Sequence, residues 1–391
     1  MNMKFNRIFL VVLDSLGVGE AIDAVDYKDN GANTLMHVNE KEELFTPNLK
    51  RLGFLDTINM NDNSDVDAYY TIARPTNKGK DSLSGHYEMM GIKNDSNLKS
   101  FVEEGIPVEL KEKIEKSIGR RVIICNKVAS DVDIINEFGQ MQIQNAALLI
   151  YSNGNSVLKI ASHEQILPVD MLYRYCDAIR TITNSYNEYK VARIVAMPFV
   201  GNKNGNFRIT NNKKEFVMTP PMKSILDHLK ENEYSVISIG KVYDLFNGSG
   251  ITKKIMAQNN KEAVDKLLEI MDKKFKGICV TNLSDFDTYG HLGDVSSYKE
   301  AIEAFDVEIP MILNTLNNDD LLIITADHGN DPTIGNNHTR ENVPVIIYSR
   351  IFKNPGKLEI LNTLADIGAT IAQNFDVNKL AIGNSFLDNL K

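Results

Sequence analysis

The sequence contains few of the residues that stabilise secreted proteins. It has no tryptophan and only three cysteines in 391 residues, and Cys125, Cys176 and Cys279 lie far apart with no Cys-x-x-Cys pair. This cysteine usage is typical of buried thiols in a reducing compartment and not of a disulfide framework. We therefore expect a cytoplasmic protein.

Long apolar runs and an excess of positive charge are also missing. The first apolar run covers only residues 8–13, which is too short for a signal-peptide core or a membrane span. The formal net charge of -9 argues against general binding to nucleic acid or to membrane surfaces. Small molecules are the expected partners, a phosphate-binding site would need metal ions or local cations, and the oligomeric state stays open.

Short apolar runs alternate with helical patterns over most of the chain, which predicts an α/β fold with a mostly parallel sheet flanked by helices. Predicted strands cover 8–13, 234–241, 278–283, 321–325 and 343–348, and predicted helices cover 224–230, 261–274, 298–316 and 361–374. The pattern changes between linkers near 98–102 and 215–221. We therefore expect an inserted α+β cap domain at 99–218 and a core domain made of 1–98 and 219–391.

Carboxylates follow three of the predicted strands, twice with histidines nearby. In chain order these residues are Asp14; Asp287 and His291; and Asp327, His328 and His338. Ligands bind beyond the carboxyl ends of parallel strands, so three such endings indicate a shared site. The alternative is a set of unrelated loop residues and helix caps, since Asp is a favoured N-cap.

A second candidate segment covers residues 79–91. Ser82, Ser84 and His86 stand where a helix is predicted to begin, and a helix N-terminus favours an anion such as a phosphate on a serine. Taken alone, the segment fits a serine N-cap with a histidine on a helix face. Beside the three carboxylate-ended strands, it supplies a candidate nucleophile.

These residue types suit a two-metal site for phosphoryl transfer, in which paired divalent ions clamp the attacking and leaving oxygens. Mixed Asp and His ligands suit manganese or zinc better than calcium or magnesium. A hydroxyl held by a metal has a lowered pKa, which would make a serine nucleophilic at neutral pH. The predicted ligands are Asp14, Ser82, Asp287, His291, Asp327, His328 and His338.

Three segments carry a resemblance that spans nearly the whole chain. They read VLDSLGVGE at 12–20, GKDSLSGH at 79–86 and TADHGNDP at 325–332, the last followed by HTRE at 338–341. Together they resemble the phosphopentomutase family of the alkaline phosphatase superfamily. That resemblance implies an alkaline-phosphatase-like core with a mobile cap and an enzyme that interconverts ribose 1-phosphate, or its 2-deoxy form, and ribose 5-phosphate. It also implies two Mn²⁺ ions, with other divalent metals left open, and a sugar 1,6-bisphosphate as primer.

The resemblance assigns roles to individual residues. Ser82 aligns with the family's phosphorylated threonine, and Ser84 is the lesser candidate. One metal would be held by Asp14, Ser82, Asp327 and His328, and the other by Asp287, His291 and His338. The residues expected to contact substrate are Asn155, Arg208, Lys241 and Arg340.

The departures from the family lie near the expected substrate site. Met197 stands where the family has an arginine, Asn155 where it has an aspartate, and 292–293 is Leu-Gly where it has two arginines. The basic residue Arg208 is shifted by one position, and the spacing from Asp287 to the next histidine is one residue shorter. An alternative is therefore a related metal-dependent phosphatase or mutase that acts on a different sugar phosphate. A non-catalytic sugar-phosphate sensor is a third hypothesis, although a sensor has no need of a serine among its metal ligands.

Overall fold

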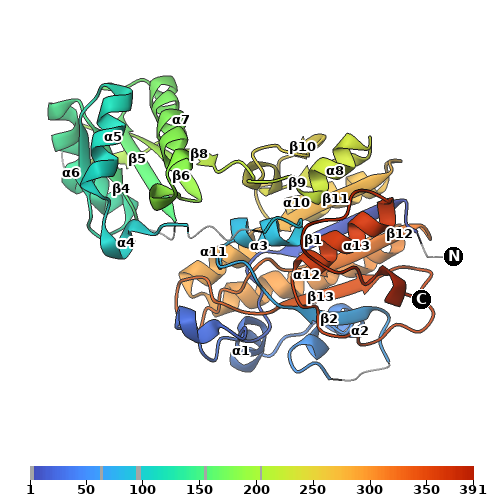
Figure 1. Cartoon of the computed structure of the whole chain (residues 1–391). Coiled ribbons are helices and arrows are strands. Elements are labelled where there is room, and N and C mark those ends of the chain that lie inside the picture. The colour runs from blue at the N-terminus through green and yellow to red at the C-terminus, as the bar shows by residue number, and fades with distance from the viewer. Residues whose placement is uncertain (1–3, 62–64, 94–97, 154–155, 203–204) are drawn as a thin grey trace. The chain divides into compact units, whose positions relative to one another are not determined.

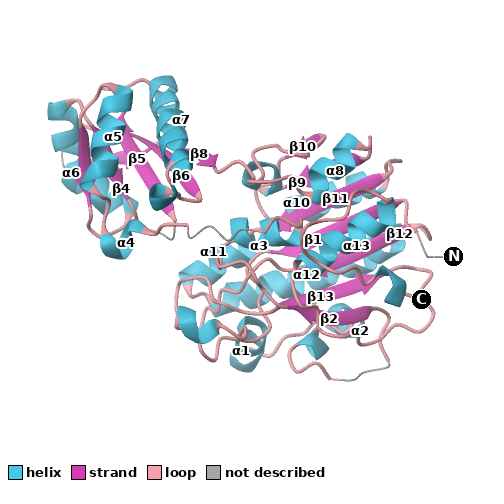
Figure 2. Ribbon diagram, in the orientation of Figure 1, coloured by secondary structure: helices cyan, strands magenta, loops and turns pink. Residues whose placement is uncertain are grey.

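The computed structural model of the chain describes residues 4–61, 65–93, 98–153, 156–202 and 205–391. The chain forms two compact units, which we call the core (Met1–Asp95 and Pro220–Lys391) and the cap (Ser96–Thr219). The boundaries expected from the sequence, 98/99 and 218/219, lie near those of the cap. Figure 1 traces the chain through both units, and Figure 2 distinguishes their helices and strands.

The core contains a seven-stranded sheet in the order β10-β9-β11-β1-β12-β13-β2. Its strands are β1 (Arg7–Leu13), β2 (Tyr69–Ala73), β9 (Ser235–Ile239), β10 (Lys253–Ile255), β11 (Gly277–Leu283), β12 (Asp320–Thr325) and β13 (Val343–Tyr348). The first five strands in the sheet order pair in parallel, and β13 pairs antiparallel with both of its neighbours, β12 and β2. All seven residues of β1 are buried, as expected for a strand whose two faces are both covered. The prediction of a mostly parallel α/β sheet is confirmed.

Helices flank this sheet in the core (Figure 2). They are α1 (Thr34–Lys41), α2 (Pro47–Arg51), α3 (Ser82–Met89), α8 (Ile225–Glu231), α9 (Val242–Leu245), α10 (Asn260–Met271), α11 (Asp285–Leu292), α12 (Val295–Thr315) and α13 (Ala365–Phe375). Short 3-10 turns cover Ala24–Tyr27, Leu55–Thr57 and Leu387–Asn389.

Two helix starts differ from the sequence prediction because of capping and long-range contacts. The helix expected at 298–316 begins at Val295, since the Asp294 side chain accepts a hydrogen bond from Ser297 N at 3.0 Å. The helix expected at 361–374 begins only at Ala365. Leu361 N instead donates to the carbonyl of Ile72, which ties residue 361 to β2.

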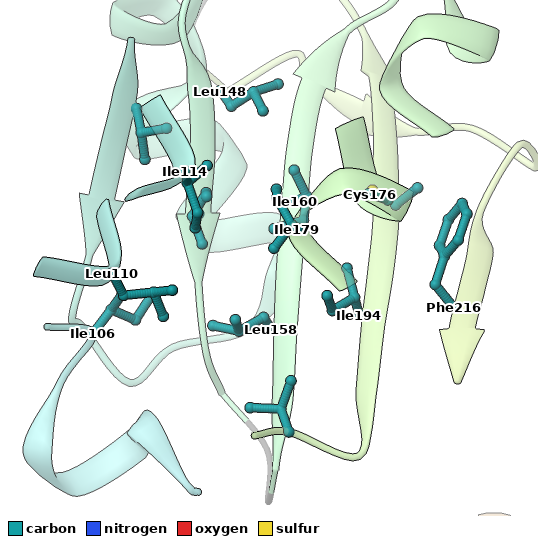
Figure 3. Packing of buried hydrophobic residues seen from close by; sticks show 14 of the residues in the cluster. Ile106, Leu110, Ile114, Leu148, Leu158, Ile160, Cys176, Ile179, Ile194 and Phe216 are labelled. Atoms are coloured by element: carbon teal, nitrogen blue, oxygen red, sulfur yellow. The ribbon is translucent and has the colours of Figure 1, made fainter. Parts of the chain in front are cut away.

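The cap has its own sheet and its own apolar core. Its strands are β3 (Val122–Cys125), β4 (Leu148–Tyr151), β5 (Val157–His163), β6 (Arg193–Val200), β7 (Arg208–Ile209) and β8 (Lys214–Val217). Its helices are α4 (Phe101–Glu104), α5 (Val108–Ile118), α6 (Asp131–Asn145) and α7 (Val169–Ser185), and a 3-10 turn covers Asn187–Tyr189. The strands follow the order β3-β4-β5-β6-β7, with β8 also paired to β6. Leu110 of α5 and Ile179 of α7 pack with Leu158, Ile160 and Ile194 of the sheet (Figure 3). A second cluster, which includes Met197, involves α6.

Among the described residues, none of the helices combines the length and the apolar composition that a membrane crossing requires.

Candidate metal centre

The order of the core strands explains why distant carboxylates meet. β1 lies between β11 and β12, and the three strands run parallel, so their carboxyl ends share one edge of the sheet. Asp14 follows β1 directly, α11 with Asp287 begins just after β11, and Asp327 comes two residues after the end of β12. The site is therefore built from both stretches of chain that make up the core.

The first group of potential ligands consists of Asp14, Asp327 and His328, all almost fully buried. The Nε2 atom of His328 lies 3.6 Å from Asp14 Oδ1 and 3.6 Å from Asp327 Oδ2. Ser82 Oγ lies 3.4 Å from Asp14 Oδ1 and 3.2 Å from His328 Nε2. The structure thus brings together the four residues that the sequence assigned to one metal.

The second group consists of Asp287, His328 and His338. His338 Nε2 lies 3.1 Å from Asp287 Oδ1 and 3.0 Å from His291 Nε2. The rings of His328 and His338 are tilted by 34° with their centroids 4.1 Å apart, so the two groups adjoin. The residues assigned to the second metal therefore lie together, and their role as ligands remains a prediction.

The orientation of the histidines fits a divalent cation. His328 Nδ1 lies 3.0 Å from the carbonyl of Gly329, and His291 Nδ1 lies 2.8 Å from the carbonyl of Asn336. A carbonyl only accepts hydrogen bonds, so in each neutral ring Nδ1 carries the proton and the Nε2 lone pair faces the site. Asp327 Oδ2 is buried and accepts no hydrogen bond from the described residues, although His86 Nδ1 lies 3.1 Å from it. A carboxylate oxygen that accepts no hydrogen bond, beside imidazole lone pairs that face the same site, fits the donor set of a metal site.

Electrostatics also favour a cation at this edge of the sheet. Burial, and next the charge of Asp327, raise the pKa of Asp14 to about 6. Burial lowers the pKa of His338 to about 4, with the charge of His328 acting in the same direction. Burial opposes the charged form of His328, but the carboxylates of Asp327, Asp287 and Asp14 outweigh it and raise its pKa. The charge of Asp327 thus repels that of Asp14 in a buried site, and a bound cation would relieve this repulsion.

Ser82 lies beside the first group because of how α3 begins. Asp81 is the N-cap and accepts hydrogen bonds from Leu83 N and Ser84 N, so the interpretation of a serine N-cap is wrong and Ser82 is the first helical residue. Lys241 Nζ donates to Ser82 Oγ at 2.7 Å and forms an ion pair with Asp14. Ser84 Oγ is buried and donates to Asp81, away from the metal ligands, so the geometry favours Ser82 over Ser84 as nucleophile.

The residues expected to contact substrate have different environments. Lys241 lies in the site, Arg208 is exposed on β7 of the cap, and Asn155 lies outside the described residues. Arg340 is 2% exposed, and its guanidinium donates to Asp23 and to the carbonyls of Pro75, Asn77 and Gly79. These contacts give Arg340 the environment of a structural residue that holds the loop before α3. A contact between Arg340 and substrate stays a prediction.

Two residues that orient the ligands were missed from the sequence, as was the buried Glu341 nearby. Asn282 Nδ2 donates to Asp14 Oδ2 at 2.9 Å, and Ser15 N donates to Asp327 Oδ1 at 3.0 Å. Ser15 adopts a φ of 73°, a left-handed conformation that is uncommon for serine and was not predicted. Glu341 is buried and accepts hydrogen bonds from the backbone and hydroxyl of Thr34. The sequence signal for one of them was Asn282 itself, an amide side chain near the end of the apolar run 278–283.

The fold and the ligand cluster define a metal-dependent enzyme, and comparison with known proteins agrees. A family model described as the Metalloenzyme superfamily matches residues 6–379. The chain is 43% identical over 397 residues to the phosphopentomutase of Clostridium tetani (strain Massachusetts / E88), with 99% of each chain covered. The chain therefore belongs to the phosphopentomutase family within that superfamily, and the resemblance noted in the sequence is confirmed.

Two solved structures match the chain at low sequence identity, and the first of them shows the same fold. Phosphoglycerate mutase from Leishmania mexicana, crystallised at low cobalt concentration, is 13% identical with a TM-score of 0.50 and covers 99% of both chains. A protein of the alkaline phosphatase superfamily from Vibrio parahaemolyticus is 12% identical with a TM-score of 0.48 and covers 98% of this chain and 70% of its own.

Proposed function

We propose that the protein is a phosphopentomutase that interconverts ribose 1-phosphate, or its 2-deoxy form, and ribose 5-phosphate through a phosphorylated Ser82. The observation that carries the proposal is the position of Ser82 Oγ, which is 2.7 Å from Lys241 Nζ and within 3.4 Å of Asp14 and His328. A serine in contact with an ammonium, a carboxylate and an imidazole is suited to accept and to return a phosphoryl group.

Two divalent metals, proposed to be Mn²⁺, are part of this function. Asp14, Ser82, Asp327 and His328 would hold one metal, and Asp287, His291 and His338 would hold the other. When bound, the metals would neutralise phosphate charge and lower the pKa of a coordinated hydroxyl. The mixed Asp and His donor set supports manganese over calcium or magnesium.

The chain's own residues then perform the transfer. Lys241 holds Ser82 Oγ in place and offsets the negative charge that gathers on it during transfer. The bond between Ser82 Oγ and phosphorus breaks as the free hydroxyl of the sugar phosphate bonds to phosphorus, and the proton of that hydroxyl passes to Ser82 Oγ, which gives a sugar bisphosphate and a free serine hydroxyl. Ser82 then takes the other phosphoryl group, so the phosphate changes position with no net hydrolysis. A sugar 1,6-bisphosphate would phosphorylate Ser82 before the first turnover.

The test is direct conversion by the purified protein. With Mn²⁺, a sugar 1,6-bisphosphate and ribose 1-phosphate, we expect ribose 5-phosphate to form without accumulation of free phosphate. The Ser82→Ala variant is the control, because it keeps the fold but removes the oxygen that carries the phosphoryl group. Absence of product from wild-type protein with both metals bound would refute the proposal. Turnover that needs Ser82 would exclude a sensor without catalytic activity.

One observation in the cap favours a second candidate, a phosphatase or a mutase for another sugar phosphate. Met197, which replaces the family's arginine, is 0% exposed and packs in the apolar cluster of the cap with Phe199 and Phe207. An arginine contact to phosphate contributes about 1.5–3 kcal/mol, so its loss would weaken binding of a given phosphate substantially. Release of free phosphate faster than isomer formation, or faster turnover of another sugar phosphate, would favour this candidate.

Cytoplasmic location is also part of the proposal. Cys125, Cys176 and Cys279 are all free and buried, which fits a reducing compartment. A thiol count on the native protein extracted under alkylating conditions tests it, since any disulfide would argue for another compartment.

A further inference from the structure

His86 lies one helical turn after Ser82 on α3, and its side chain is fully buried. Its Nδ1 atom lies 2.9 Å from the carbonyl oxygen of Ser82 and 3.1 Å from Asp327 Oδ2. Since a carbonyl can only accept, Nδ1 must carry a hydrogen. The polar N–H of one imidazole thus faces both the backbone of the proposed nucleophile and a proposed metal ligand.

The neighbouring glycine shows how closely these segments pack. A Cβ atom at Gly85 would lie 2.1 Å from the carbonyl oxygen of Asp327, so only glycine allows α3 to approach the chain there. The contact between α3 and the end of β12 is therefore direct. His86 lies at this contact, with its Nδ1 atom near both the Ser82 carbonyl on α3 and the carboxylate of Asp327.

The two oxygens of Asp327 have different surroundings. Oδ1 accepts a hydrogen bond from Ser15 N at 3.0 Å, which fixes one side of the carboxylate. Oδ2 faces His86 Nδ1 and lies 3.6 Å from His328 Nε2. Rotation of the carboxylate would move Oδ2 away from the first ligand group, and the close contact of Oδ2 with the polar Nδ1–H group of His86, at 3.1 Å, opposes that rotation.

We propose that His86 is a positioning residue, which holds Asp327 Oδ2 and the backbone of Ser82 at a fixed spacing and so sets the metal affinity of the first ligand group. The proposal rests on the proposed function only in that the first group binds a divalent metal. Residues that orient metal ligands typically change metal affinity by about 10- to 100-fold when they are replaced. His86 belongs to this class because it touches the ligand and lies outside the expected metal contacts.

Two substitutions separate the Nδ1 contact from side-chain volume. In His86→Asn the amide nitrogen is bonded to Cγ, as Nδ1 is in histidine, so a donor remains near the same point. In His86→Gln the amide nitrogen lies one bond further out and leaves that point without a donor. His228→Gln on α8 is the matched control, because His228 lies in no ligand group among the described residues.

The measurement is a titration of metal-free protein with Mn²⁺ by calorimetry, in an Asp287→Ala background that removes a ligand of the second group only. We expect His86→Gln to weaken the remaining site by about 10- to 100-fold. His86→Asn and His228→Gln should stay within about threefold of the background protein. Thermal unfolding of each metal-free variant checks that it is folded.

Two results would overturn the proposal. One is unchanged Mn²⁺ affinity in His86→Gln, and the other is an equal loss in His86→Asn and His86→Gln, which would point to helix packing alone. If His86→Gln does not fold, the comparison of His86→Asn with His86→Leu replaces it under the same criteria. A protein that binds Mn²⁺ as expected but lacks mutase activity would refute the proposed function and leave the role of His86 intact.

Discussion

Replacement of Lys241 by methionine tests the contact on which the proposed chemistry depends most. Lys241 Nζ donates to Ser82 Oγ at 2.7 Å and pairs with Asp14, and its side chain is 28% exposed. Methionine keeps the length and apolar character of the side-chain stem and removes the ammonium. The variant should therefore fold normally while Ser82 loses its only charged donor among the described contacts.

The size of the effect follows from the strength of a charge-assisted hydrogen bond. Such a bond contributes roughly 1.5–3 kcal/mol. Because Lys241 is partly exposed, water replaces some of the lost interaction, and we expect the lower half of this range. A difference of about 1.4 kcal/mol is tenfold in rate, so phosphorylation of Ser82 by a bisphosphate primer should slow by about 10- to 40-fold.

The assay is the rate at which the protein gains one phosphoryl group, followed by intact mass. Lys254→Met is the matched control, since Lys254 has a similar exposure of 31% and pairs with Asp244, but makes no contact with Ser82. The control should react at the wild-type rate. A Lys241→Met rate within about twofold of wild type would refute the reasoning, because the ammonium would then contribute nothing to the transfer.

Four further outcomes are expected. Ser82→Ala should abolish phosphorylation by the primer, whereas Ser84→Ala should still yield the Ser82 phosphopeptide, as peptide mapping by mass spectrometry checks. Chelation of bound metal should lower the unfolding temperature measured by calorimetry, since a ligand at 100 times its Kd contributes about 2.7 kcal/mol per site. Gly85→Ala would place a methyl group 2.1 Å from the Asp327 carbonyl, so Mn²⁺ affinity and the unfolding temperature should fall, whereas Gly335→Ala, with nothing within 4 Å, should leave both unchanged. Burial raises the pKa of Cys279 to about 12, so iodoacetamide at about pH 8 should modify it only after denaturant is added, and labelling of the native protein would contradict its burial.

The sheet and the ligand cluster were accessible from the sequence for a physical reason. Strands buried on both faces have continuous apolar sequences, and the polar residues that end them stand out sharply. The predicted strands 8–13 and 321–325 therefore end at the same residues as β1 and β12 do in the structure. Asp14 follows one residue after β1 and Asp327 two residues after β12. Parallel pairing then placed those residues at one edge.

The contacts that orient the site were not accessible, because they join residues far apart in the chain. Arg340 follows two residues after His338 and looked available for a phosphate, yet its partner Asp23 lies 317 positions away. The role of His86 likewise depends on Asp327, and the left-handed turn at Ser15 has no sequence signal. Helix α13 begins late because Leu364 N donates to Glu88 of α3, another contact that only the folded chain defines.

The split of the core around the cap has a consequence for synthesis on the ribosome. Among the described residues, β1 pairs with β11 and β12, and β2 pairs with β13 and with bridging residues near 357 and 361, so the described strand partners of β1 and β2 all come from the second stretch. The nascent chain therefore carries seven apolar-rich residues of β1 without a partner while the cap is already being made and can fold. Translation that stalls before residue 277 would leave this strand without either partner, which makes such incomplete chains natural clients of chaperones.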